Sequence, residues 1–405
     1  MSQPAPISSV AAPASARTAS RNAGAAIRPF AGLIDPILVD EPVLFTFPGS
    51  LGRDAAMAAW TWAVRDTSAD LVSLDGVFNG ALTGADFEPV ATEVALRMRA
   101  GLEQAGKDPD AARRLKAQMA RDDHRELLVT AISALRHRSL LAKAQAFGKA
   151  TNAITDDAAL QTALQSMPLK DPQLAALLFQ AAVGKVANPA RLITAVIKLA
   201  GGATDAAIGR AGFSPMVDAY LAHAQNQLHN LQLLGPFADF DLVCRSLDRF
   251  HRLVRALTGY IEFSRGSRAT QVLSALTKHV SDRVEPRLKE VAVDVNQALR
   301  RPREGADRLD DDRLLAAVNG VYLLSAVRDS RDSLALNAVF DQAWSQTGQA
   351  LEMHAQRIIE HLRQAPGDAL GGARMDATIK MAEIRFNADY AETLRRARVA
   401  AERRS

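Results

Sequence analysis

The chain has 405 residues, of which 48% are hydrophobic and 23% charged, which is typical of a soluble globular protein with more than one lobe. The net charge of +4 is carried by the two ends: residues 1–34 hold +3 and residues 395–405 hold +4, so the body between them holds −3. This body disfavours a nucleic-acid groove, which needs a basic face, and the single cysteine, Cys244, excludes an intrachain disulfide and a multi-cysteine metal site.

The first 34 residues predict a disordered tail. They are rich in Ala, Ser, Pro and Arg, contain no acidic residue, and lack the continuous apolar stretch of a secretory signal peptide. The only strand-like run, Val43–Phe47, follows between two prolines. Because one short strand cannot form a sheet alone, residues 42–48 are expected to be a short extended arm on the helices, or half of a hairpin. A short helix is predicted at Arg53–Arg65.

From Phe87 onward the apolar residues repeat at helical spacing, which predicts an all-α fold: a multi-helix bundle or an irregular helical array. The first helices are expected at Phe87–Gln104, Pro109–Ala120 and Arg121–Phe147. Capping positions then recur at intervals of 16 or 17 residues, at Thr155–Asp157, Asp171–Pro172, Asn188–Pro189 and Thr204–Asp205. This spacing suits a helical repeat protein, and a compact set of short antiparallel helices explains it equally well.

The second half of the chain predicts longer helices, at Ser214–Leu234, Phe240–Glu262, Thr270–Leu299, Asp312–Val327 and Ser333–Gln364. Pro366–Gly372, with three glycines, predicts a flexible linker. The most apolar window, Pro172–Gly184, is shorter than the roughly 18–20 residues of a membrane-spanning helix, so no transmembrane segment is predicted.

These breaks predict five parts of the chain. They are a disordered tail (1–34), an arm with short helices (35–108), a helical core domain (109–265), a long-helix bundle (266–366), and a linker with a C-terminal amphipathic helix (367–405).

The final predicted helix, Ala373–Arg403, carries the candidate partner-binding residues. One face presents an apolar stripe made of Met375, Ile379, Phe386, Tyr390 and Leu394. Packing on the protein's own body is the default for this stripe, and binding to a protein partner or to a second copy of the chain is the alternative. The basic end of the helix would also suit a peripheral contact with an anionic membrane, or the dipole of the helix itself.

No stretch of the sequence carries a recognisable catalytic or cofactor motif. Phe47–Arg53 lacks the Gly-Lys-Ser/Thr ending of a phosphate-binding loop, so a Pro-Gly turn is the better interpretation. Asp310–Asp312 lacks the DDxxD spacing of a magnesium motif and suits the positive end of a helix. His354 and His361 share a helix face without the Glu-x-x-His pairs of a di-iron bundle. The sequence therefore predicts no cofactor and no metal site.

Three functional hypotheses follow. The leading one is a non-enzymatic scaffold or adaptor that binds proteins in the cytoplasm of a bacterium whose genome is GC-rich, since arginine outnumbers lysine by 39 to 10. The alternative is an effector or regulator secreted without a cleavable signal peptide by a type III-like system, because the tail is acid-free and rich in Ser, Pro and Ala. The third is an enzyme whose residues converge only on folding, which a deep polar pocket with titratable groups of shifted pKa would favour.

Overall fold

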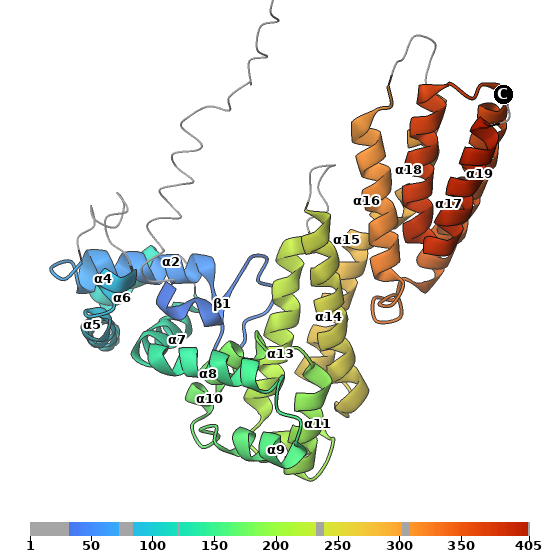
Figure 1. Ribbon diagram of the computed structural model, residues 1–405. Helices are drawn as coiled ribbons and strands as arrows, with labels where there is room; N and C mark the ends of the chain where they lie inside the picture. The colour runs from blue at the N-terminus through green and yellow to red at the C-terminus, as the bar shows by residue number, and fades with distance from the viewer. Residues whose placement is uncertain (1–31, 73–83, 120–121, 232–238, 302–307, 404–405) are drawn as a thin grey trace, which may run out of the picture. The chain divides into compact units, whose positions relative to one another are not determined.

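The computed structural model describes residues 32–72, 84–119, 122–231, 239–301 and 308–403 (Figure 1). Over these residues the fold is all-α, as the sequence predicts, and the two strands contain two residues each. The predicted disordered tail lies outside the described residues except for its last three positions. Ile34 is fully buried, so the tail cannot extend to position 34.

The chain divides into two compact units. The first comprises Met1–Gly202 and Ala206–Ala222, and the second comprises Ala203–Asp205 and His223–Ser405. The five-part division expected from the sequence stays a prediction.

The elements up to residue 226 are η1 (Asp35–Ile37), β1 (Leu38–Val39), β2 (Leu51–Gly52), α2 (Arg53–Trp62), the π-helical η2 (Ala63–Thr67), α4 (Gly84–Phe87), α5 (Ala91–Ala105), α6 (Pro109–Met119), α7 (His124–Arg136), α8 (Arg138–Ala150), α9 (Asp157–Gln165), α10 (Pro172–Val183), α11 (Pro189–Ala200), α12 (Asp205–Arg210) and α13 (Ser214–Asn226). The later elements are the 3₁₀ helix η3 (Gln227–Leu231), α14 (Phe240–Tyr260), α15 (Arg268–Ala298), α16 (Asp311–Val327), α17 (Asn337–Gln364), α18 (Ala369–Arg385) and α19 (Ala388–Glu402).

The predicted arm is in place, but the strand predicted at Val43–Phe47 does not form. The strands lie on either side of it, where β1 pairs with β2 in parallel. The turn that follows the arm packs on α10: a Cβ at Gly49, whose φ is +77°, would collide with the backbone of Ala176. Only glycine fits this approach, so the Pro-Gly turn fixes the end of the arm against a helix.

The single helix predicted at Arg121–Phe147 is wrong, because the chain forms two helices, α7 and α8, that meet at His137. The Nδ1 atom of His137 lies 2.9 Å from the carbonyl oxygen of Ser133, at the end of α7. Arg138 then donates to the carbonyl oxygen of Leu135 and to Glu88. The apolar periodicity continues on both sides of this junction, so the pattern alone does not reveal the break.

Helices α8 to α11 form two stacked helix pairs, in which α8 packs on α10 and α9 packs on α11. The predicted caps are confirmed at Asp156, Asp171 and Asn188, whose side chains accept hydrogen bonds from the first turns of α9, α10 and α11. Within each pair the two helices start about 33 residues apart along the chain, which is the period seen in the sequence. α8 approaches α10 so closely that a Cβ at Gly148 would collide with the carbonyl of Ala182.

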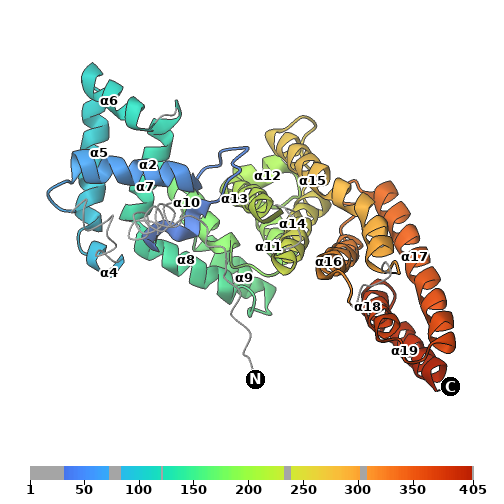
Figure 2. The ribbon, with the colours of Figure 1, turned by 90° about the horizontal axis from the view of Figure 1, so that it is seen from above.

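In the second unit, α16 to α19 lie side by side (Figures 1 and 2). The linker predicted at Pro366–Gly372 is wrong in its second half. Asp368 caps α18, which begins at Ala369, so Gly371 and Gly372 are helical and buried. A Cβ at Gly371 would lie 3.1 Å from Leu362, so glycine serves close helix packing here, not flexibility.

The single C-terminal helix predicted at Ala373–Arg403 is also wrong. It breaks at Phe386, and Asn387 caps α19 by accepting a hydrogen bond from the backbone N–H of Tyr390 at 2.8 Å. The break folds α19 back onto α17 and α18, and the three helices share one apolar cluster. Its buried members are Ala355, Ile358, Leu362, Met375, Ile379, Ala382, Ala391, Leu394 and Ala401.

No helix in the described part of the chain is both long and apolar enough to cross a lipid bilayer.

Candidate functional site

A groove of about 620 Å³ lies among α14, α16 and α18 in the second unit. We call it the α16–α18 groove, and it is lined by Cys244, Tyr322, Ser325, Ala326, Arg328, Asp329, Lys380, Glu383 and Ile384. Its residues recur three or four positions apart along α16 and along α18, so each helix contributes one face. The groove is thus built by two parallel rows of side chains.

The floor of the groove is apolar. Tyr322 is 47% exposed, while Val321, Leu323 and Leu324 beside it on α16 are buried. Ala326 and Ile384 beside it are half-buried. These side chains leave apolar surface in a concave position, which is typical of binding sites.

The rim of the groove is charged. Arg328 pairs with Asp329 at 3.3 Å, and Glu383 pairs with Arg395 of α19 at 2.8 Å. Lys380 forms no ion pair with any described residue. The rim therefore holds two cations and two anions, of which one cation is without a counter-charge.

The thiol of Cys244 offers no reactive nucleophile. Burial and the nearby Asp241 carboxylate raise its pKa to about 11. The thiolate is the reactive form of cysteine, so this side chain is protonated and inert at neutral pH.

Arg385, the last residue of α18, fixes this helix to α17 next to the groove. Its guanidinium lies 3.5 Å from the ring centroid of Trp344 and donates from Nε and Nη2 to the Trp344 carbonyl oxygen, at 3.1 and 2.6 Å. A Cβ at Gly348 would lie 2.9 Å from Arg385 Nη2, so glycine makes room for this contact. Burial lowers the pKa of Arg385 to about 10, which still leaves it charged at neutral pH. Arg328 lies over the same Trp344 ring, 5.8 Å from its centroid.

The stripe predicted to bind a partner lies on the other side of α18. Met375, Ile379 and Leu394 are buried, and Phe386 and Tyr390 pack half-buried against the same cluster with their ring centroids 4.6 Å apart. The structure brings all five together across two helices, inside their own unit. Their role in partner binding stays a prediction.

The sequence pattern missed the groove residues on α18, because Lys380, Glu383 and Ile384 occupy the face opposite the apolar stripe. One signal was available on α16. Its apolar residues surround the helix, and a helix that is apolar all round must cover more than one face. Tyr322 is on the face that the described residues leave exposed.

A second groove, of about 540 Å³, is rich in hydroxyl groups and includes Ser333. The Ser333 Oγ atom lies 3.0 Å from Nδ1 of His251, and burial and Arg255 lower the pKa of His251. A neutral imidazole beside a serine can act as a base. The Nε2 atom of His251 makes no hydrogen bond with a described residue, so the third, orienting group of a catalytic triad is missing from the described residues.

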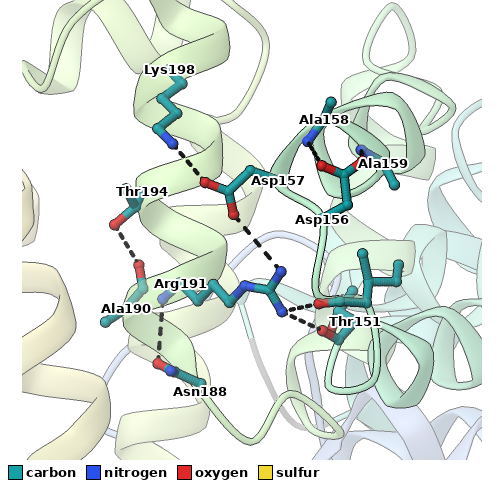
Figure 3. A network of polar contacts seen from close by, with 11 residues as sticks. Thr151, Asp156, Asp157, Ala158, Ala159, Asn188, Ala190, Arg191, Thr194 and Lys198 are labelled. Atoms are coloured by element: carbon teal, nitrogen blue, oxygen red, sulfur yellow. Dashed lines mark hydrogen bonds and ion pairs between the residues drawn. The ribbon is translucent and has the colours of Figure 1, made fainter.

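A network of polar contacts in the first unit surrounds Arg191 (Figure 3). Its guanidinium donates to the carbonyl oxygens of Ile154 and, at 3.5 Å, of Thr151, both in the connection that follows α8. Asp157 lies 3.8 Å from Arg191 and pairs with Lys198 at 2.7 Å. Because Arg191 belongs to α11, the network ties the two stacked helix pairs together, and we interpret it as a structural clamp.

Among the described residues, no group of three or more His, Cys, Asp or Glu side chains is placed to hold a metal ion. Comparison with protein-family models, with curated proteins and with solved structures finds no match.

Proposed function

We propose that this is a non-enzymatic helical protein that binds other proteins, and that it does so through the α16–α18 groove. The observation that carries the proposal is the exposure of Tyr322 in an open groove whose lining combines apolar and charged side chains. Aromatic anchors in such pockets, surrounded by polar side chains, provide much of the energy of protein–protein binding.

The chemistry of the groove favours binding over catalysis. None of the residues that line it is a histidine, and Cys244 is protonated at neutral pH. Of the charged side chains on the rim, Arg328 pairs with the adjacent Asp329 and Glu383 pairs with Arg395 of α19, while Lys380 forms no ion pair with a described residue. Such groups can select a partner by charge.

The test is photo-crosslinking in the native cell from a photoreactive amino acid placed at position 322. The matched control carries it at position 293, because Val293 is 52% exposed on α15 of the same unit and does not line the groove. We expect position 322 to form a discrete adduct with one protein that position 293 does not form. Identical adducts at the two positions, or none at 322, would contradict the proposal.

The C-terminal helices are a weaker choice for the binding surface. A partner that contacts Met375 or Ile379 would have to separate α18 from α17 and α19 first. A membrane contact through the basic end of α19 would have to break ion pairs, since Arg395 pairs with Glu383 and Glu392, and Arg398 pairs with Glu402 at 2.8 Å. These partners reduce the positive charge available to anionic lipids.

A second proposal is that the protein is an effector or regulator exported by a type III-like route. It is favoured by the acid-free Ser/Pro/Ala-rich N-terminus. A reporter enzyme fused to residues 1–31, which exclude the buried Ile34, tests it. Secretion of this fusion by a type III-competent cell and not by a secretion-deficient one would support export, and retention in both would refute it. If the fusion is retained in both cells, the cytoplasmic location of the first proposal is kept.

A further inference from the structure

The walls of the α16–α18 groove indicate the secondary structure of the segment that binds there. Most lining residues belong to helices, whose backbone N–H and C=O groups are already bonded within the helix. The groove therefore offers side chains and no sheet edge. An extended peptide could not add a strand there and would have to hydrogen-bond its backbone to water, whereas a helix satisfies its backbone groups internally.

The apolar floor defines one contact of that helix. Tyr322 of α16 and Ile384 of α18 both line the groove, and α16 packs directly on α18. An aliphatic or aromatic side chain between them would remove apolar surface of both from water. One apolar anchor on the incoming helix is thus required.

The rim defines a second contact, through Lys380. Each of its charged neighbours has a partner: Glu383 is held by Arg395, and one turn earlier on α18 Asp376 is held by Arg398. Lys380 is exposed and forms no ion pair with a described residue. Its ammonium group can therefore pair with a carboxylate of a bound partner.

We propose, on the basis of the function proposed above, that the groove takes an amphipathic α-helix of a partner protein. This helix carries an apolar anchor for Tyr322 and Ile384, and an Asp or Glu within one turn of the anchor for Lys380. Arg328 and Asp329 close the other side of the rim and, as a neutral pair, add no preference for charge.

The test is selection of a displayed library of helical peptides, about four turns long, on the full-length protein. The peptides share an amphipathic framework and vary along one face. The wild type, K380E and Y322A are used in parallel. Lys380 and Tyr322 are both exposed, so neither change should unfold the protein, and thermal melts check this. The matched control is K289E, which makes the same charge change at an exposed position of α15 outside the groove.

We expect the wild type and K289E to select peptides with an acidic residue one turn from an apolar anchor. K380E should select a basic residue at the same position and bind the acidic peptides about tenfold or more weakly, because an attractive pair becomes a repulsive one. Y322A should enrich neither set.

The same consensus from the wild type and K380E, an extended or proline-rich consensus, or no enrichment that depends on Tyr322 would overturn the assignment of this occupant. Crosslinking at position 322 separates the two proposals. If the cellular adduct forms while the selection fails, the groove binds a protein of other chemistry; if both fail, the groove is not a binding site.

Discussion

Arg191 and Arg374 hold helix ends by the same chemistry. Arg191 donates to carbonyl oxygens just after α8, and Arg374 donates from Nε and Nη2 to the Leu299 carbonyl oxygen, the C-cap of α15. The last carbonyls of a helix lack partners within the helix and carry partial negative charge, so a guanidinium both bonds and neutralises them. Neither residue marks itself in the sequence among the 39 arginines.

Replacing Arg191 with Ala should lower the free energy of unfolding by roughly 2–3 kcal/mol, because charged hydrogen bonds to half-buried carbonyls are lost. Urea denaturation measures this. Lys198→Ala is the control: it removes the exposed pair with Asp157 and should cost at most about 1 kcal/mol. Equal losses in both variants would show that Arg191 is not a clamp.

His354 should make the second unit sensitive to mild acid. Its Nε2 atom lies 3.0 Å from the Asn296 Oδ1 atom and donates to it, while Nδ1 is buried without a hydrogen-bond partner. Burial, together with Arg374 and Arg357, lowers the pKa of His354. The unfolded chain therefore takes up this proton first, so the stabilisation is complete above about pH 6.5 and is lost as the pH falls toward the folded pKa.

The measurement is the free energy of unfolding at several pH values between neutral and mildly acidic. In the His354→Gln variant the free energy of unfolding should fall less steeply as the pH is lowered. Part of the fall should remain, because His251 and His279 also have lowered pKa values. A slope unchanged by His354→Gln would refute the argument.

At the scale of elements, helix type follows from the sequence, but helix ends often do not. The pattern places the starts of α10 and α11, and both ends of α14 and α16, within two residues of their true positions, because caps or prolines mark the starts. It runs through the breaks at His137 and Phe386, because apolar residues continue at helical spacing on both sides. A break is then decided by packing: α19 covers more apolar surface folded against α17 and α18 than it would as an extension of α18.

Phe386→Ala tests the packing of this folded-back helix. Phe386 is half-buried against the shared cluster, so we expect a loss of roughly 2–3 kcal/mol in the free energy of unfolding, less than for a fully enclosed phenylalanine. Val399→Ala on α19, where Val399 is 43% exposed, should change stability by less than about 0.5 kcal/mol. Unchanged stability together with weaker association of Phe386→Ala would instead assign the stripe to a partner.

At the scale of the whole molecule, the position where the folded chain begins can be tested by truncation. Deleting residues 1–31 should leave the melting temperature unchanged, because this segment has little apolar periodicity. Deleting residues 1–37 should lower it by several degrees, because Ile34 and Ile37 are fully buried. A large destabilisation by the shorter deletion, measured by circular dichroism, would show that the N-terminus is part of the fold.

The sequence by itself determined the all-α class, the capped starts of α9, α10 and α11, and the packing role of the C-terminal stripe as its default. These properties depend on residues within a few positions of each other, which a periodicity reports directly. Only the tertiary structure decided the junctions at His137 and Phe386, the burial of Gly371 and Gly372, and the α16–α18 groove. The groove joins Tyr322 to Lys380, 58 positions apart, and its exposed face is what remains after all other helices are packed. No local sequence pattern predicts this exposed face, because it depends on which surfaces the rest of the chain covers.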